Sequence, residues 1–387
     1  MGNIGIKKAW NHVTKHLLHE KTNLIYDSIL KDSDFPTPEE TRVSYPNPCG
    51  YGTGMEDSMI SAGTMLDACL ILWETQKAPE AEKISHRIVD GMIRCADSAY
   101  TEGFLPRSVT PIDGKSHYIN SSRDQYTLFV FGAHRYINSD ICINEEKKNL
   151  SRILEGFAKR AEKNITKENY YDMLRDDGGK SHVTAFWGES LENHEYLRLP
   201  MIYLAAWEAS ENEHWLEAYR KIRTEAYEKS LPMSSYWHLY ALQQMQVSVR
   251  LCYDADPDEG WKEKYGFLLN EVADYALGMV PEISKEISER CDVNVPSQCF
   301  RDRELKENIY LKKLGLNYLT PVHKDADTFF FMQDAANIAI TVGLSPDIKL
   351  TKEAAELFKN SYKKIDFEKH TRALSVHFLQ GYYRAFV

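Results

Sequence analysis

Two acidic residues in the first third of the chain stand where a carboxyl group could transfer protons. Asp57 follows Glu56 and the glycine-rich turn of residues 50–54, and Asp124 follows a short polar stretch that ends in Arg123. Behind each of them lies an apolar segment that we expect to be a buried helix, so both carboxyls should be partly withdrawn from water. A desolvated carboxyl keeps its proton to higher pH and can act as a general acid. A single acidic residue at a helix start usually serves as a helix cap. The glycine-rich turn before Asp57 and the polar residues before Asp124 favour a catalytic role for these two residues instead.

Polar and aromatic residues recur at the starts of six apolar segments. These segments begin near residues 55, 123, 192, 233, 326 and 371. Helices that start at one common opening present free N–H groups and positive dipole ends there, which suits an anionic or polyhydroxylated ligand. The chain has no Walker A loop, no dinucleotide-binding glycine motif, no H-E-x-x-H metal motif and no Gly-x-Ser-x-Gly nucleophile turn, so the corresponding classes of enzyme are disfavoured.

Helical periodicity runs through the whole chain, and the alternation typical of strands is rare. We expect twelve helices, at about residues 5–19, 55–77, 79–98, 123–138, 144–165, 192–210, 212–229, 233–253, 258–279, 326–343, 352–364 and 371–385. The even-numbered helices are apolar nearly all round, whereas the odd-numbered ones carry a single apolar stripe. This pattern predicts an all-α fold of the (α/α)6 barrel type, a six-hairpin toroid with the even-numbered helices inside and the odd-numbered ones outside. No linker-like stretch divides it, so residues 1–387 are expected to form a single catalytic domain.

One connection, residues 281–325, is much longer than the others. It contains the segment from Cys291 to Phe300 and the charged stretch that follows it. Long connections in compact proteins are often functional, so we expect this one to carry a short helix and to fold over the opening as a lid or rim.

The composition narrows the class of ligand. The chain of 387 residues has a formal net charge of −10 and no basic stripe, which argues against nucleic acid and against an anionic membrane surface. An anionic ligand therefore needs a local group of arginines or lysines. Aromatic residues make up 12% of the chain, with 23 Tyr and 7 Trp, and fit either a sugar-stacking cleft or a large helical core. The sequence specifies no oligomeric state.

The cysteines and the first residues of the chain indicate in which cellular compartment the protein is expected. Seven cysteines, an odd number without C-x-x-C spacing, are expected to be reduced thiols. The first residues lack the apolar core of a signal peptide, and no apolar run is long enough to span a membrane. We expect a cytoplasmic protein, and removal of a signal peptide stays open as the alternative.

Four short motifs in the first half of the chain combine acidic, small and aromatic residues. They run from Met55 to Gly63, from Glu102 to Arg107, from Ser122 to Tyr126 and from Phe186 to Glu189. In these motifs the chain resembles the six-hairpin glycosidases, and among them the unsaturated glucuronyl and rhamnogalacturonyl hydrolases. One departure is Arg123, which stands where that family has an acidic or small residue. The adjacent cation favours the ionised form of Asp124, which suits a base better than an acid.

The resemblance implies hydrolysis at the non-reducing end of a short oligosaccharide that carries a uronic acid. In that family one Asp protonates the enol-ether double bond of the sugar and activates water, without a metal or organic cofactor. Carried over to this chain, it makes Asp124 the acid/base and Asp57 its partner. Arg123, Arg107 and His182 become candidates for holding a carboxylate, and the remaining candidates for the sugar-binding wall are Glu56, Tyr51, Tyr126, Trp187, Glu189 and Trp237.

Two alternatives remain open at the level of the sequence. One is a polysaccharide lyase on the same toroid, which removes a proton beside a uronate carboxyl; His182 with Tyr51 or Tyr236 could serve as its base. The other is a glycan-binding protein without catalytic activity. A lyase creates a conjugated double bond and the hydrolase removes one, so the absorbance of the product separates these two. The binding protein predicts that mutating the carboxylates changes binding only.

Overall fold

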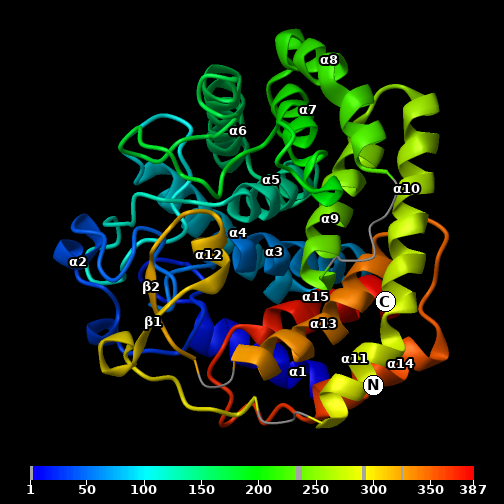
Figure 1. Ribbon diagram of the computed structural model, residues 1–387. Helices are drawn as coiled ribbons and strands as arrows, with labels where there is room; N and C mark the ends of the chain where they lie inside the picture. Colours follow the sequence, from blue (N-terminus) through cyan, green and yellow to red (C-terminus); the bar gives the residue numbers. More distant parts are fainter. Residues whose placement is uncertain (1–2, 232–237, 290–292, 324–325) are drawn as a thin grey trace.

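The computed structural model describes residues 3–231, 238–289, 293–323 and 326–387, and helices dominate them (Figure 1). Six helices form an inner ring in which each packs against the next and the last returns to the first, in the order α3, α5, α7, α9, α13, α15. Their bounds are α3 Ser58–Gln76, α5 Arg123–Ile137, α7 Arg198–Ser210, α9 Leu239–Ala255, α13 Ala326–Gly343 and α15 Leu374–Phe386. These are the six even-numbered segments of the prediction. The structure confirms the all-α fold of the (α/α)6 barrel type.

An outer layer of helices covers this ring. Their bounds are α1 Asn3–His12, α4 Pro79–Asp97, α6 Asn144–Asn164, α8 Glu213–Lys229, α10 Glu259–Gly278 and α14 Lys352–Lys363. α1 packs on α15, and α4 packs on α3. Both α6 and α8 pack on α7, while α10 packs on α9 and α14 on α13. The division follows from burial, because α3 is buried at every position from Ser58 to Leu72, whereas α4 buries one stripe and leaves the opposite side in water.

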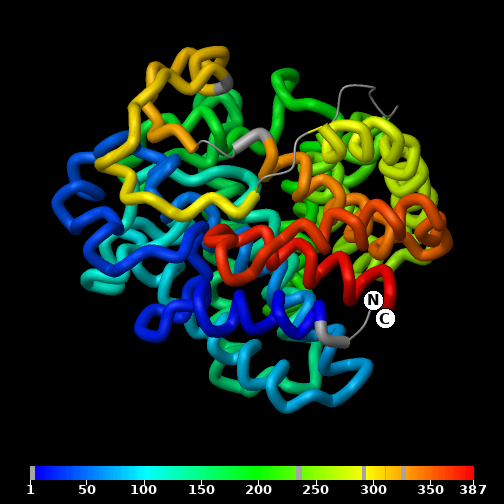
Figure 2. Tube along the Cα trace, turned by 90° about the horizontal axis from the view of Figure 1, so that it is seen from below, coloured from blue at the N-terminus to red at the C-terminus, as the bar shows by residue number. Residues whose placement is uncertain are grey.

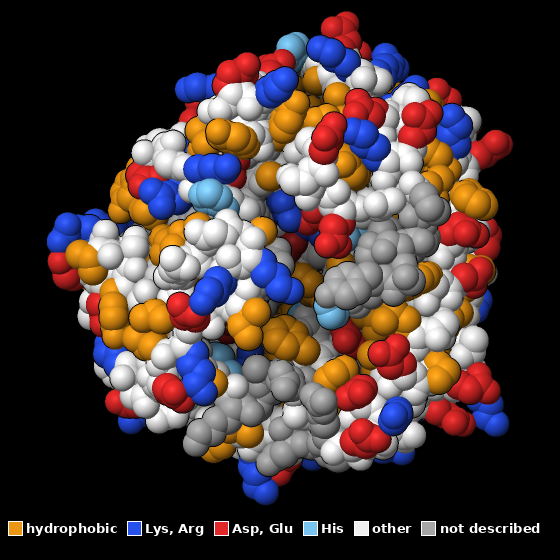
Figure 3. Space-filling model, in the orientation of Figure 1, with side chains coloured by type: hydrophobic (Ala, Val, Ile, Leu, Met, Phe, Trp, Pro, Cys, Tyr) orange, Lys and Arg blue, Asp and Glu red, His pale blue; other side chains and the backbone are white. Residues whose placement is uncertain are grey.

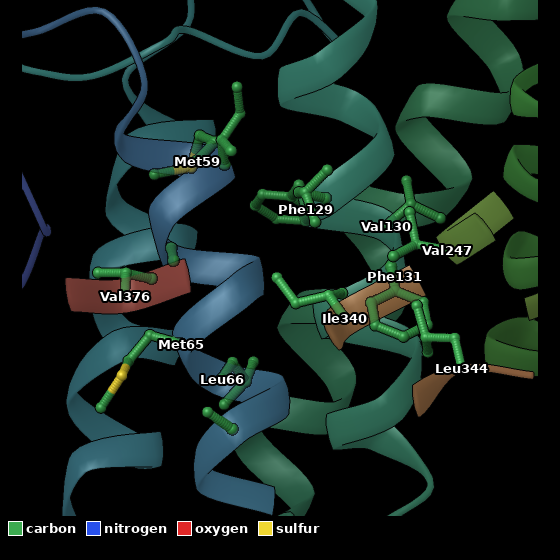
Figure 4. Close-up of a cluster of buried hydrophobic side chains, with 14 of the residues drawn as sticks. Met59, Met65, Leu66, Phe129, Val130, Phe131, Val247, Ile340, Leu344 and Val376 are labelled. Atoms are coloured by element: carbon green, nitrogen blue, oxygen red, sulfur yellow. The ribbon is translucent and has the colours of Figure 1, made fainter. Parts of the chain in front are cut away.

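The inner helices share a common apolar core (Figure 4). Met59, Met65 and Leu66 of α3 lie beside Phe129, Val130 and Phe131 of α5. The other inner helices add Val247 of α9, Ile340 of α13, Leu344 just after α13, and Val376 of α15. All ten residues are buried. Burial of such side chains is the main favourable term in folding, and here it fixes the distances between the inner helices.

Two glycines allow α3 and α5 to approach each other closely. A Cβ atom on Gly63 would lie 2.0 Å from the carbonyl oxygen of Leu128, and one on Gly132 would lie 2.8 Å from the Cα atom of Gly63. No side chain fits at either position without moving backbone. The glycines therefore bring the first turns of α3 and α5 together, and these turns carry Asp57 and Asp124.

Replacing Gly63 with alanine should force the two helices apart. We expect the free energy of unfolding to fall by about 2 kcal/mol or more, because overpacking against backbone cannot be relieved by a rotamer change. Gly278→Ala is the matched control, since a Cβ there meets no atom within 4 Å. It should leave stability unchanged or raise it by up to about 1 kcal/mol. Equal denaturation midpoints for the two variants would contradict the close approach.

The long connection before α13 forms a small structure of its own. It begins with α11 (Val280–Glu289) and continues into β1 (Leu305–Glu307), α12 (Ile309–Lys313) and β2 (Leu319–Pro321). The two strands pair antiparallel, Leu305 opposite Pro321, and residues 305–321 are called the lid hairpin below. The short helix was predicted. The sheet was not, because strands of three residues are too short to show alternation.

The lid hairpin rests on the loop that precedes α3. The Nδ2 atom of Asn47 donates a hydrogen bond to the carbonyl of Leu319 at 3.1 Å. Gly52 has a φ of +77°, and a Cβ there would lie 2.8 Å from the carbonyl oxygen of Pro321. A side chain at Gly52 would therefore push the lid hairpin away, so glycine is needed for both the turn and the contact. The short helix α2 (Pro38–Arg42) precedes this loop in the chain.

The helices nearest to the two ends of the chain, α1 and α15, lie side by side (Figure 2). The N-terminal α1 packs on the C-terminal α15. Among the described helices, none combines the length and the apolar character needed to cross a bilayer.

Candidate active site

The starts of four inner helices, α3, α5, α7 and α9, meet on the side of the molecule that carries the lid hairpin. Gln125 at the start of α5 donates to Asp57 at the start of α3. Arg198, the first residue of α7, and Tyr240 in the first turn of α9 both donate to Asp124. Figure 3 shows that this face is hollowed near its middle, with acidic and basic side chains inside the hollow. The structure therefore brings Asp57 and Asp124 into one group of polar side chains.

Asp57 is held through one of its two carboxyl oxygens. Oδ1 accepts hydrogen bonds from Nε2 of Gln125 at 2.9 Å and from Nη1 of Arg107 at 3.4 Å. In the described part of the chain both side-chain contacts reach Oδ1, which leaves Oδ2 as the oxygen able to carry a proton. The side chain is 46% exposed, so a ligand can reach it.

The pKa of Asp57 is raised to about 7. Desolvation by the surrounding protein is the largest cause, even though about half of the side-chain surface stays accessible. The negative charges of Glu56 and Asp124 add to the shift, while Arg107 and the hydrogen bond from Gln125 oppose it. Near neutral pH this carboxyl therefore exchanges its proton readily, as a general acid must.

A third carboxylate, Asp27, anchors the turn that carries Asp57. Its Oδ2 and Oδ1 atoms accept hydrogen bonds from the backbone N–H groups of Glu56 at 2.6 Å and Asp57 at 3.0 Å. Burial and then the charges of Asp57 and Glu56 raise the pKa of Asp27 well above its usual value. Asp27 thus fixes the orientation of the backbone just before α3.

Asp124 is in the opposite electrostatic state. Its Oδ1 atom accepts from Nη1 of Arg198, which is only 2% exposed, and its Oδ2 atom accepts from the hydroxyl of Tyr240 at 2.6 Å. Burial alone would raise the pKa of Asp124, but the charge of Arg198 and the hydrogen bond from Tyr240 outweigh it and hold the pKa below its usual value. Asp124 is therefore ionised at the pH at which Asp57 is half protonated.

Arg107 ties the loop before α3 to the rest of the site. It is buried and donates from Nη1 to the carbonyl of Glu56 at 2.9 Å and from Nη2 to the hydroxyl of Tyr51 at 2.8 Å. Its guanidinium also lies 4.5 Å from the centre of the Tyr51 ring. Arg107 and Tyr51 thus lie beside Asp57, and the guanidinium of Arg107, a predicted holder of a substrate carboxylate, is engaged by the protein itself.

Two residues close to Asp124 in sequence, Arg123 and Tyr126, contact other parts of the protein rather than the group around Asp57 and Asp124. Arg123 donates to the carbonyl of Ala185 at 2.7 Å and pairs with Glu195, so a carboxylate of the protein already occupies the place expected for one of a substrate. Tyr126 is fully buried and packs against Phe157 and Phe186 in the core. The prediction that Tyr126 stacks on a sugar is therefore wrong, because residues two apart on a helix point in nearly opposite directions.

The remaining predicted residues lie on the loop before α7 or beyond the described part of the chain. Trp187 packs edge to face on Tyr196, and Glu189 is exposed. His182 has a φ of +67°, and its backbone N–H donates to Asp172 at 2.8 Å. These contacts do not bring Trp187, Glu189 or His182 to Asp57 or Asp124. Trp237 lies outside the described residues.

Sequence reasoning missed four residues that set the state of the two carboxyls: Asp27, Gln125, Arg198 and Tyr240. Arg198 had one signal, since it is a cation at the start of a helix whose residues from Leu199 to Trp207 carry no charge. Neither carboxyl forms a side-chain cap on its helix, so the capping explanation does not account for them. Among the described residues, no group of three or more His, Cys, Asp or Glu side chains has the arrangement of a metal site.

Comparisons with known proteins find a likeness in structure but none in sequence. No protein-family model matches the chain, and no curated protein matches it in sequence. Among solved structures, a sugar epimerase from a ruminal bacterium is similar over 99% of this chain and 99% of its own, with a TM-score of 0.49 and 10% sequence identity. A similarity of this degree says nothing about the reaction, which must be inferred from the residues of the present chain.

Proposed function

We propose that the chain is a carbohydrate-active enzyme, a glycoside hydrolase acting on an oligosaccharide that contains a uronic acid, with residues 1–387 as one catalytic domain. Asp57 is the general acid and Asp124 is its ionised partner. The observation that carries the proposal is the pair of carboxyls on neighbouring helix starts, one with its pKa raised to about 7 and the other with its pKa lowered. In glycosidases the two catalytic carboxyls typically lie in environments that shift their pKa values apart, so that one serves as the acid and the other stays ionised.

The roles differ from those that the resemblance implied. There Asp124 was the acid/base, but its two oxygens are engaged by Arg198 and Tyr240, and its low pKa makes it a poor proton donor. Asp57 has an oxygen free of side-chain contacts within the described residues and a pKa suited to the task. We therefore assign proton donation to Asp57.

The proposed reaction consumes one water molecule. The proton of Asp57 passes to the departing glycosidic oxygen as its bond to the sugar carbon breaks. The carboxylate of Asp124 stabilises the positive charge that develops on the sugar ring. Water then forms the new bond to that carbon, and its proton returns to Asp57. For an unsaturated uronyl sugar the same acid would protonate the double bond instead.

The pH dependence of kcat/KM should report these two carboxyls. Activity requires protonated Asp57, so kcat/KM should fall as pH rises through about 7, and ionised Asp124 keeps activity down to acidic pH. Glu56→Gln removes the charge that contributes most, after burial, to the raised pKa of Asp57. The alkaline fall should then move to lower pH, while the amide oxygen can still accept from Gly52. Glu39→Gln, an exposed carboxylate on α2, is the control and should leave the profile unchanged. An unshifted profile in Glu56→Gln would argue against Asp57 as the acid.

The proposal is tested by incubating the purified protein with saturated and unsaturated uronate-containing disaccharides. The expected result is release of two monosaccharides, with loss of the ultraviolet absorbance of the conjugated double bond for the unsaturated substrates. A gain of absorbance would identify a lyase instead. Binding without turnover across the whole panel would identify a glycan-binding protein.

A further inference from the structure

The lid hairpin has an apolar underside that is separate from the main core of the barrel. Leu311 and Leu316 are 1% and 8% exposed, and they pack with Val183 of the loop before α7. Tyr51 and Tyr318 pack against this small group, and the five residues, called the lid cluster below, do not belong to the large core. A contact group of so few residues can open locally while the barrel stays folded.

Tyr51 is the member of the lid cluster that reaches the candidate active site. Its hydroxyl accepts a hydrogen bond from Nη2 of Arg107 at 2.8 Å, and the Arg107 guanidinium lies 4.5 Å from the centre of its ring. Nη1 of the same guanidinium donates to the carbonyl of Glu56 at 2.9 Å and to Oδ1 of Asp57 at 3.4 Å. A single arginine therefore lies between Tyr51 and the proposed general acid.

The buried side chain of Asn47 joins the backbone of Tyr51 to the lid hairpin. Its Oδ1 atom accepts from the backbone N–H of Tyr51 at 3.0 Å. Its Nδ2 atom donates to the carbonyl of Tyr51 at 3.2 Å and to the carbonyl of Leu319 in the lid hairpin at 3.1 Å. Hydrogen bonds and apolar contacts thus hold the lid hairpin on the loop that carries Tyr51.

The state of Asp57 depends on how dry its surroundings are and on how close Arg107 comes. Desolvation raises the pKa of Asp57, whereas the charge of Arg107 lowers it. The docked lid hairpin keeps water from the ring of Tyr51, and the hydroxyl of Tyr51 keeps the guanidinium from moving closer to Asp57. The titratable and charged groups that interact with Asp57 are Asp27, Tyr51, Glu56, Arg107, Asp124 and Tyr240. Of these six groups, Tyr51 alone belongs to the lid cluster.

We propose that Tyr51 is a positioning residue that couples the lid hairpin to the general acid, so that Asp57 can donate its proton only while the lid hairpin is docked. The inference rests on the proposed function for the role of Asp57. When the lid hairpin leaves, the ring of Tyr51 loses its apolar cover, water reaches Arg107, and the guanidinium is free to approach Asp57. Both changes stabilise the carboxylate form and withdraw the proton that the reaction needs.

An NMR titration of isotope-labelled aspartate carboxyl groups tests the coupling without substrate. Leu311→Ala removes the most deeply buried side chain of the lid cluster, so the backbone amides of the lid hairpin should exchange their hydrogens at least about tenfold faster. The titration midpoint of Asp57 should fall by about one pH unit or more from its value near 7. The alkaline fall in kcat/KM should move in the same direction by the same amount.

Tyr51→Phe separates docking of the lid hairpin from its effect on Asp57. Phenylalanine keeps the ring that packs in the lid cluster but lacks the hydroxyl that accepts from Arg107. Amide exchange in the lid hairpin should stay at the wild-type rate, while the midpoint of Asp57 should still fall. Leu314→Ala is the matched control for Leu311→Ala, because Leu314 is an exposed leucine at the end of α12. It should leave both the exchange and the midpoint unchanged.

The outcomes distinguish this coupling from the proposed function. An unchanged midpoint of Asp57 in Leu311→Ala or in Tyr51→Phe would overturn the coupling, as would unchanged amide exchange in Leu311→Ala or an equal fall of the midpoint in Leu314→Ala. A wild-type midpoint near pH 4 would overturn both the coupling and the general acid. If the midpoint falls as expected in both variants but the protein cleaves no uronate-containing disaccharide, the proposed reaction fails and the coupling stands.

Discussion

Replacing Asp57 with asparagine is expected to lower kcat/KM by about 100- to 10,000-fold, the usual contribution of general acid catalysis. The amide keeps the size of the side chain, and its oxygen can still accept from Gln125 and Arg107. What it lacks is a proton to donate at the pKa of about 7 that the site creates. The loss should therefore appear mainly in kcat and be independent of whether the substrate is neutral or anionic.

The same sample should melt at nearly the wild-type temperature, because Asp57 is half exposed and its neighbours keep their contacts. Asp140→Asn is the matched control. Asp140 is an exposed carboxylate beyond the opposite end of α5, where it accepts from Trp73 and Lys77. It should retain full activity. Wild-type turnover by Asp57→Asn would show that Asp57 is not the general acid.

Asp124→Asn is expected to have two effects at once. Turnover should fall strongly, because the negative charge that stabilises the developing cation is lost. Stability should fall as well, by on the order of 3 kcal/mol, because Arg198 is buried and loses the charge that compensates it. A residue that merely capped α5 would cost much less, since asparagine is itself a good cap. Denaturant unfolding and kcat/KM on the same preparation measure both effects.

A double variant tests the pairing with Arg198 directly. In Asp124→Asn combined with Arg198→Gln, two neutral side chains face each other and Tyr240 keeps a hydrogen-bond acceptor. Stability should recover in part, while turnover should remain low. If the free energy of unfolding of Asp124→Asn falls by less than about 1 kcal/mol, the ion pair between Asp124 and Arg198 does not stabilise the site.

The fold could be predicted because burial leaves a clear record in the sequence. α3 is apolar nearly all round and α4 has one apolar stripe, and these two patterns suffice to assign an inner and an outer layer. The order of the layers then follows from the alternation along the chain. The long connection was predicted to carry a short helix and to fold over the opening, but its two strands were not predicted, because the pairing of Leu305 with Pro321 leaves no periodic signal.

The sequence placed two carboxyls of the candidate site near each other but did not indicate their protonation states. Asp57 and Asp124 were found because acidic residues precede apolar helices. Their protonation states depend on partners that only folding brings near, such as Arg198, which is 74 residues away from Asp124 in the chain. Helix geometry alone could have excluded Tyr126, because a residue two positions after Asp124 points away from the side on which Asp124 lies.

The central claim is that Asp57 keeps its proton near neutral pH beside an ionised Asp124, and an NMR titration of isotope-labelled aspartate carboxyl groups tests it without any substrate. The Asp57 and Asp124 signals are assigned by their absence in the respective asparagine variants. The account predicts that Asp57 titrates with a midpoint near pH 7 and that Asp124 stays ionised to below the usual range for aspartate. A midpoint near pH 4 for Asp57, the ordinary value for an exposed aspartate, would contradict the account.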